Sequence, residues 1–186
     1  MAMIQTIDEK ILLFFQAIRF EALTSFFSLF IKLEIWHLVA IVLIIFFLVR
    51  SKTLRVPVIS YYIAWNAAFF WFNLLKDHFH RLRPFLTVKG LIPVLTPHGF
   101  SFPSGHATIA AAMATVLAFH FPHARVLVFV LAVLAGLSRV YFGVHYMTDV
   151  LAGFLLGGII GAISLAVEMI ILKINKPAEL CHKDKI

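Results

Sequence analysis

Long uncharged apolar runs constrain this chain most. Val56–Leu75 is an apolar stretch of 20 residues without a charged side chain, about the length that a helix needs to cross the hydrocarbon core of a bilayer. Further apolar runs occupy 35–49, 104–121, 126–139 and 146–172. A backbone that crosses lipid must satisfy its own hydrogen bonds, so these runs must be helices. The sequence therefore predicts an all-α fold, a polytopic transmembrane helix bundle of about five spans.

Composition agrees with a membrane protein and excludes several function classes. Hydrophobic residues make up 62% of the chain and charged residues 13%, and the mean hydropathy is +0.97, far from the values of a soluble domain. The formal net charge is +7, but the basic residues do not follow the aromatic–basic pattern typical of nucleic-acid binding. The positive charge therefore indicates anionic lipid or a phosphate substrate as the partner. The single cysteine, Cys181, excludes an intrachain disulfide and a cysteine metal site.

The N-terminal segment is apolar but interrupted by charge. If Ile11–Ile31 spanned the bilayer, Arg19 and Glu21 would fall near its midplane. We therefore expect residues 1–33 to form one or two amphipathic helices in the membrane interface, with a true span over 11–31 as the alternative. Residues 34–173 are then the transmembrane core, and 174–186 a polar tail.

Polar clusters interrupt the apolar pattern at three places. With five spans, the segments 76–103 and 138–146 lie at the same membrane face, and Pro84 is expected to end the helix that carries Lys76. Residues 85–103 are expected to form a loop. The candidate site residues of the three clusters are Lys76 and Arg83; Ser104, Gly105 and His106; and Arg139, His145 and Asp149.

The residue types in these clusters favour phosphoryl transfer. The three fixed cations imply a multiply charged anion, since Arg and Lys bind phosphate oxygens. A helix beginning at Ser104 offers free backbone N–H groups to that anion. His145 and Asp149 are four residues apart, so a helix places them on one face, where a carboxylate fixes the imidazole tautomer. Two histidines can supply an attacking nitrogen and a proton source. The remaining requirements of phosphoryl transfer are positioning of the substrate and neutralisation of its charge.

The three clusters together resemble the signature of the type-2 phosphatidic acid phosphatase superfamily. Lys-x6-Arg-Pro spans 76–84, Pro-Ser-Gly-His spans 103–106, and Ser-Arg-x5-His-x3-Asp spans 138–149, with a match at every motif position. In size and hydropathy the chain is similar to the small bacterial membrane lipid phosphatases of that family, such as undecaprenyl-diphosphatases and phosphatidylglycerophosphatase B-like enzymes.

The resemblance implies a role for each matched residue. His145 would be the nucleophile that forms a phosphohistidine, Asp149 would hold its other ring nitrogen, and His106 would protonate the leaving group and then activate water. The resemblance also implies an enzyme without a metal or other cofactor, a metal-independent hydrolase of phosphoric esters or diphosphates. The residues expected to hold the phosphoryl oxygens are Lys76, Arg83, Ser104, Gly105 and Arg139.

The sequence does not determine which lipid is the substrate. The lead is a polyprenyl diphosphate such as undecaprenyl diphosphate, and phosphatidylglycerol phosphate, phosphatidic acid and the lipid A 1-phosphate stay open. Arg81 and Lys89 are candidates to meet a second phosphate. An apolar lip for the lipid is expected from Phe85, Leu86, Phe100 and Phe102. A non-catalytic lipid-phosphate binder or transporter is the alternative from another class. His78, His80 and His98 match no motif and receive no role.

The sequence gives weaker signals about the membrane side of the site and about association between copies of the chain. Basic residues number eight on each side of the predicted bundle, and eight against five once Lys76, Arg83 and Arg139 are set aside as site residues. The positive-inside rule then favours a multi-pass protein of the bacterial inner membrane with an extracytoplasmic site. Small residues four apart in the last span, at Gly153, Gly157 and Gly161, allow close helix packing, either within the chain or between copies. The oligomeric state is left open.

Overall fold

Helices make up the regular structure of the computed structural model, which describes residues 2–31 and 55–174. The all-α prediction is confirmed. The predicted span at 35–49 and the tail beyond 174 lie outside the described residues. The helices are α1 (Ala2–Ala17), α2 (Glu21–Ile31), α4 (Arg55–Phe79), α5 (Pro84–Thr87), α6 (Gly105–His120), α7 (Arg125–Tyr141) and α8 (Met147–Ile174), with a 3-10 turn, η2 (Pro122–Ala124), before α7.

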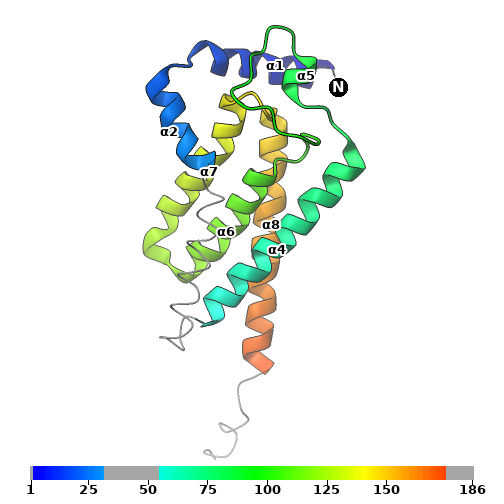
Figure 1. Cartoon of the computed structure of the whole chain (residues 1–186). Coiled ribbons are helices and arrows are strands. Elements are labelled where there is room, and N and C mark those ends of the chain that lie inside the picture. The colour runs from blue at the N-terminus through cyan, green and yellow to red at the C-terminus, as the bar shows by residue number, and fades with distance from the viewer. Residues whose placement is uncertain (1, 32–54, 175–186) are drawn as a thin grey trace, which may run out of the picture.

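The helix at the centre of the bundle is α6, which packs against α4, α7 and α8 (Figure 1). Its buried positions are small, with Ala107, Ala111, Ala112, Ala114 and Ala118 all buried. Small side chains let neighbouring helices approach closely, which matters in lipid because packing replaces the hydrophobic effect as the driving force. The core of the bundle is therefore built on close helix contact rather than on large side chains.

The glycines of α8 lie against this alanine-rich helix. A Cβ at Gly153 would come within 2.7 Å of the Ser104 carbonyl oxygen, and one at Gly157 within 2.1 Å of the Thr108 carbonyl oxygen. A Cβ at Gly161 would also meet α6. The small-residue face of α8 thus packs within the chain, against α6.

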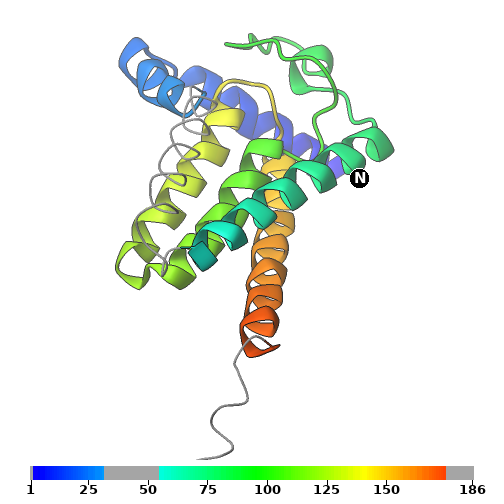
Figure 2. The same cartoon turned by 60° about the horizontal axis from the view of Figure 1, so that its bottom comes forward.

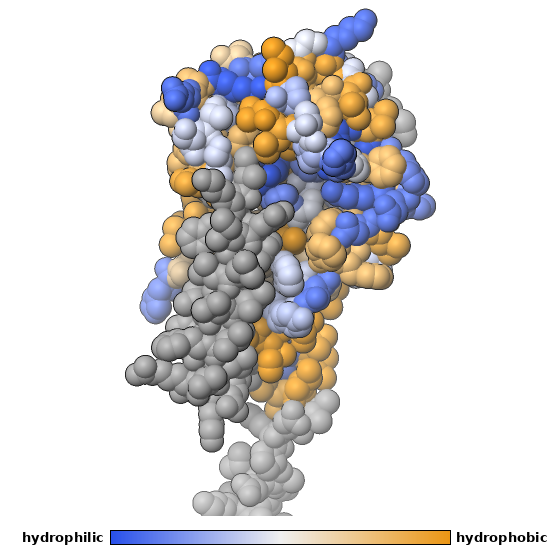
Figure 3. Space-filling view, in the orientation of Figure 1, coloured by the Kyte–Doolittle hydropathy of each residue, from blue (hydrophilic) through white to orange (hydrophobic). Residues whose placement is uncertain are grey.

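Several helices are long and apolar enough to cross a membrane. Among the described residues the candidate spans are Pro57–Thr87, which covers most of α4 and all of α5, Pro122–Tyr141, which covers η2 and α7, and Met147–Lys173, which lies in α8. The bent pair α1 and α2 would make a fourth if it were one span. Figure 3 shows mostly apolar side chains along the part of α8 left uncovered, and a more mixed surface at the end that carries α1. The chain is a multi-pass membrane protein.

The N-terminal segment forms two helices, α1 and α2, separated by a sharp bend. Between α1 and α2 the chain bends by 115°. Figures 1 and 2 show α1 lying across one end of the bundle, beside the segment that contains α5. Two helices agree with the one or two that were expected; their position in the membrane interface stays a prediction.

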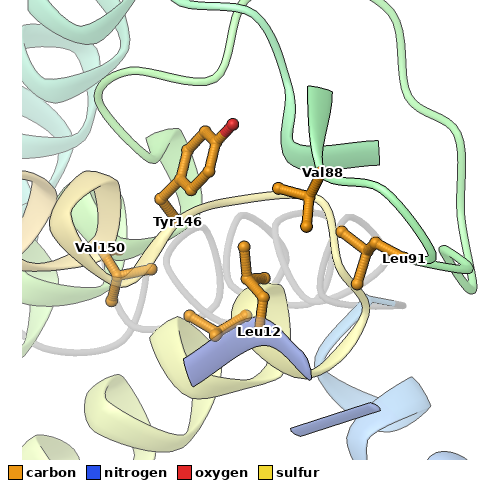
Figure 4. Close-up of a cluster of buried hydrophobic side chains, with 7 residues drawn as sticks. Leu12, Val88, Leu91, Tyr146 and Val150 are labelled. Atoms are coloured by element: carbon orange, nitrogen blue, oxygen red, sulfur yellow. The ribbon is translucent and has the colours of Figure 1, made fainter. Parts of the chain in front are cut away.

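A hydrophobic cluster fastens α1 to that end of the bundle. Leu12 of α1 is fully buried among Val88, Leu91, Tyr146 and Val150 (Figure 4). The cluster joins α1 to the 85–103 segment and to the start of α8. This segment was expected to be a loop throughout, but α5 forms within it because Pro84 is favourable at the first position of a helix.

Candidate active site

The first site segment follows the end of α4. Pro84 was expected to end this helix, but α4 ends at Phe79, because His80 adopts a left-handed backbone conformation with φ 49°. Lys76 is half-buried in the last turn of α4, with its Nζ atom 5.4 Å from the ring centre of Phe72. Its charge acts on both Arg83 and Asp149. The early end of the helix turns the following residues back toward the bundle.

Arg83 is buried and held by main-chain carbonyl groups. Its Nε donates to the Gly99 oxygen at 2.9 Å, and its Nη2 donates to the His98 oxygen at 3.0 Å. Its Nη1 donates to the Val144 oxygen at 3.1 Å. The 85–103 segment therefore folds back to fix the guanidinium group, and His98, which had no predicted role, contributes its carbonyl oxygen.

The second site segment is the beginning of α6. Ser104 is fully buried, and its Oγ has no hydrogen-bond partner among the described residues. Its backbone N–H donates to the Asp149 carbonyl oxygen at 3.0 Å, so the expectation of a free N–H at Ser104 is wrong. Gly105 is the first residue of α6, where backbone N–H groups have no partner within the helix. His106 follows it and is half-buried.

The close approach of α4 explains why residue 105 is glycine. A Cβ at Gly105 would lie 2.9–3.1 Å from the ring atoms of Phe72. A larger residue would therefore have to move the Phe72 ring, which lies one turn before Lys76 on α4. Glycine at 105 leaves room for this ring beside the start of α6.

The third site segment is the turn between α7 and α8. Arg139 is buried in the last turn of α7, and its carbonyl oxygen accepts hydrogen bonds from the backbone N–H groups of Val144 and His145. Gly143 has φ +74°, a conformation that other residues rarely adopt. This tight turn places His145 directly before α8, whose first turn carries Asp149.

His145 lies between a cation and a carboxylate. Its Nε2 is 3.5 Å from Arg83 Nη1, and its Nδ1 is 3.5 Å from Asp149 Oδ2. Both distances are long for hydrogen bonds, as is common for catalytic contacts before substrate binds. Burial lowers the pKa of His145 to about 4, against the opposing effect of Asp149. The imidazole is therefore neutral at physiological pH, with Nε2 directed at a guanidinium group.

The family follows from the sequence match to known models. Residues 56–170 match the model of the PAP2 superfamily, which covers more than half of the chain and all three site segments. The chain belongs to the PAP2 superfamily. The resemblance given by the three motifs is thereby confirmed.

Two named relatives of this PAP2 protein carry the names of phosphatases. It is 42% identical over 96 residues to phosphatidylglycerophosphatase B of Bacillus subtilis, a match covering 46% of the chain and 45% of the relative. It is 33% identical to an undecaprenyl-diphosphatase of Sulfolobus acidocaldarius, over 86% of the chain and 76% of the relative. The aligned part thus spans less than half of the first relative and about three quarters of the second. The activity in each name is that of the relative.

A solved structure supports the same fold. The crystal structure of a transmembrane PAP2 type phosphatidylglycerolphosphate phosphatase from Bacillus subtilis superimposes with a TM-score of 0.77. The two chains are 28% identical, and the superposition covers 92% of this chain and 89% of that one. The helical arrangement around the site is therefore that of a membrane PAP2 phosphatase.

Two functional candidates in this PAP2 protein escaped the sequence motifs. Arg81, a sequence candidate to meet a second phosphate, donates to Asp149 and to Asp8 of α1; its part in binding a second phosphate stays a prediction. Asp8 is buried to 1% exposure, although the sequence around it is polar. A signal was present, since Asp8 and Leu12 are four residues apart and share the buried face of α1. Lys89, the other residue considered for a second phosphate, is exposed.

The expected apolar lip is only partly exposed. Leu86 is 64% exposed, whereas Phe85 packs against the core cluster around Tyr141. The rings of Phe100 and Phe102 pack against His80 and Phe79, respectively. These aromatic contacts fasten the 85–103 segment to the end of α4, so Leu86 is the member of the set most open to a lipid chain.

Proposed function

We propose that this protein is a membrane lipid phosphatase that removes a terminal phosphate from a lipid phosphate or diphosphate. The observation that carries the proposal is the placement of His145, with Arg83 at Nε2 and Asp149 at Nδ1, each at 3.5 Å. A carboxylate at Nδ1 keeps the proton on that nitrogen and leaves the Nε2 lone pair for attack. The neighbouring guanidinium would hold the phosphoryl group at that lone pair.

In the first step, Nε2 of His145 attacks phosphorus and the bond from phosphorus to the lipid oxygen breaks. His106 gives its proton to the departing oxygen, which leaves as the lipid alcohol, or as the lipid monophosphate when the substrate is a diphosphate. Asp149 stabilises the positive charge that develops on the imidazole ring. The product of this step is a phosphohistidine, a covalent intermediate that divides one displacement into two.

In the second step, water attacks the phosphohistidine. His106, now neutral, accepts a proton from the water molecule, the P–Nε2 bond breaks, and inorganic phosphate leaves. His145 returns to its neutral form with the proton on Nδ1. Both steps use the same two histidines in alternating roles, so no external co-reactant besides water is consumed.

The charge on the transferring group would be neutralised by fixed donors. Arg83 and Arg139 are buried and Lys76 is half-buried, so their positions change little during the reaction. The unpartnered Oγ of buried Ser104 and the amide groups at the start of α6 add neutral donors. We assign charge neutralisation to these side chains and amide groups.

Undecaprenyl diphosphate, or another polyprenyl diphosphate, is the lead substrate. The support is the relative of that name, which matches most of the chain. Phosphatidylglycerol phosphate is the second candidate, favoured by the relative and the solved structure named for it. Phosphatidic acid and the lipid A 1-phosphate complete the panel to be tested.

We place the site on the extracytoplasmic side of a bacterial inner membrane, with α1 and α2 in the interface. The described basic residues Arg55, Arg125 and Lys173 lie at the start of α4, the start of α7 and the end of α8. These helix ends are remote from the site end of the bundle (Figure 1). Positive charge at that face favours it as the cytoplasmic one.

The test is phosphate release from a panel of the four lipids by purified protein in detergent micelles. We expect turnover of at least one lipid and none by His145→Ala. If the wild-type protein bound these lipids but released no phosphate from any of them, the alternative of a non-catalytic binder or transporter would replace this proposal.

A further inference from the structure

A partly buried ion-pair chain links α1 to the candidate catalytic carboxylate. Asp8 has three donors: its Oδ1 accepts from the Thr148 backbone N–H at 3.1 Å, and its Oδ2 accepts from the Thr148 hydroxyl and from Arg81 Nη2 at 3.0 Å. Asp8 and Thr148 are 140 residues apart in sequence. The carboxylate therefore fixes α1 to the first turn of α8, the turn that carries Asp149.

Arg81 continues the chain from Asp8 to Asp149. Its Nη1 donates to Asp149 Oδ1 at 2.5 Å and to the Thr148 hydroxyl at 2.8 Å. Its guanidinium carbon lies 3.9 Å from the ring centre of Tyr146, a stacking distance. Two carboxylates and an aromatic face thus determine the position of this one side chain.

The remaining contacts of Asp149 show what Arg81 does for it. Asp149 is fully buried. Its Oδ2 accepts from the Tyr146 backbone N–H at 2.9 Å and faces His145 Nδ1, whereas its Oδ1 is held by Arg81. Burying a carboxylate is costly unless a cation and hydrogen-bond donors compensate it. Arg81 supplies the cation and also fixes the rotation of the carboxylate, so that Oδ2 points at the imidazole.

We propose that Arg81 and Asp8 are positioning residues, which hold Asp149 in the orientation that aims His145 at the phosphorus atom. In this arrangement α1 completes the active site. The hydrophobic contacts of Leu12 (Figure 4) dock α1, and Asp8 sets its register against Arg81. The inference rests on the proposed function, since it concerns the histidine chemistry proposed there.

A neighbouring arginine provides a matched control. Arg19 also fastens the N-terminal helices to the bundle, because its Nε and Nη2 donate to the Tyr141 carbonyl oxygen at 2.9 and 2.6 Å. It additionally donates to the Ile92 carbonyl oxygen. None of these three contacts reaches His145 or Asp149. If Arg81 served only to anchor α1, Arg81→Gln and Arg19→Gln would have the same consequences.

The experiment is a double-mutant cycle in full-length protein in detergent micelles. Steady-state kcat and KM are measured with p-nitrophenyl phosphate and with a polyprenyl diphosphate for the wild type, Arg81→Gln, Asp149→Asn and the double variant. We expect Arg81→Gln to lower kcat by ~10–100-fold, the range typical of residues that orient a catalytic group, with KM changed less than about 3-fold. In the Asp149→Asn background, the same change should cost less than about 2-fold, because Arg81 acts through Asp149.

Further variants keep the test decisive. Asp8→Asn should lower kcat less than Arg81→Gln, and Arg81→Lys should recover part of the loss, since it restores the charge but not the two-sided contact. Arg19→Gln should lower the unfolding temperature and keep kcat within about 2-fold of the wild type. If Arg81→Gln does not fold, the same cycle is run with Arg81→Lys and Asp8→Asn.

Two results would overturn the inference. One is an equal response of Arg81→Gln and Arg19→Gln, in which stability falls and kcat is retained. The other is an undiminished loss from Arg81→Gln in the Asp149→Asn background. Failure of the proposed function has a different signature, a wild-type protein that releases no phosphate from any substrate, and it would overturn both.

Discussion

Replacing Asp149 by asparagine should disable His145 through the wrong tautomer. The carboxylate presents one oxygen to Arg81 at 2.5 Å and the other to Tyr146 N–H and His145 Nδ1. Asparagine has a single oxygen, and Arg81 can only donate. The amide oxygen should therefore turn to Arg81, which leaves the NH₂ group facing Nδ1. His145 must then accept at Nδ1 and carry its proton on Nε2, where the attacking lone pair should be.

The expected loss can be worked from these contacts. A hydrogen bond from Nδ1–H to a charged carboxylate contributes about 1.5–3 kcal/mol, and it strengthens as the imidazole becomes charged in the transition state. Its loss raises the barrier by roughly 1.5–3 kcal/mol, or about 10–10²-fold in kcat, whereas the Tyr146 N–H left without an acceptor lowers stability rather than kcat. Asp149→Ala should lose no more than Asp149→Asn, because alanine imposes no tautomer.

The assay is single-turnover hydrolysis of p-nitrophenyl phosphate, with thermal unfolding as the check on folding. Asp149→Asn should fold and bind substrate, and its first turnover should be slowed by the stated factor. A folded Asp149→Asn protein within about 5-fold of the wild type would refute the tautomer argument, as would an Asp149→Ala protein slower than Asp149→Asn.

Three further predictions concern packing and titration. Gly157→Ala should lower the free energy of unfolding by about 1–3 kcal/mol, because the alanine Cβ would lie 2.1 Å from a carbonyl oxygen of α6. Gly158→Ala should cost less, since a Cβ there meets nothing within 4 Å, and equal losses of stability in the two variants would contradict this packing. Glu168→Leu should cost about 1–3 kcal/mol by removing the acceptor that faces His120 Nε2 at 3.0 Å and a serine hydroxyl of α4, whereas Glu168→Gln retains an acceptor and should cost less in thermal unfolding. Burial lowers the pKa of His145 from 6.5 to about 4, so the stability gained by keeping its imidazole neutral is complete above pH 6.5 and is lost as the pH falls through about 4. Over this pH range the unfolding temperature should fall more for the wild type than for His145→Gln. Parallel curves for the two proteins would show that burial does not depress this pKa.

Much of the bundle follows from local pattern. The predicted helix at 104–121 is found at Gly105–His120, and the one at 146–172 at Met147–Ile174, because long apolar runs between polar turns leave a membrane chain few alternatives. The motif residues were also predictable, since their spacing is local to each cluster. Their separate roles in catalysis stay predictions.

The support of the site was not predictable in the same way. Asp8 and Arg81 are 73 residues apart, and no periodicity relates an N-terminal carboxylate to an arginine that lies two residues before Arg83. The carbonyl oxygens that hold Arg83 belong to a segment without regular structure, where side-chain pattern says nothing about main-chain direction. Such contacts depend on how the 85–103 segment folds back over the bundle, which is a tertiary property.

Identification of the phosphorylated residue tests the central claim most directly. Rapid-quench reaction with ³²P-labelled lipid should give a protein-bound label that is acid-labile and base-stable, as expected for phosphohistidine. The label should accumulate in His106→Ala, which lacks the group that activates water, and should be missing in His145→Ala. Label in His145→Ala and none in His106→Ala would contradict the account by exchanging the roles of the two histidines.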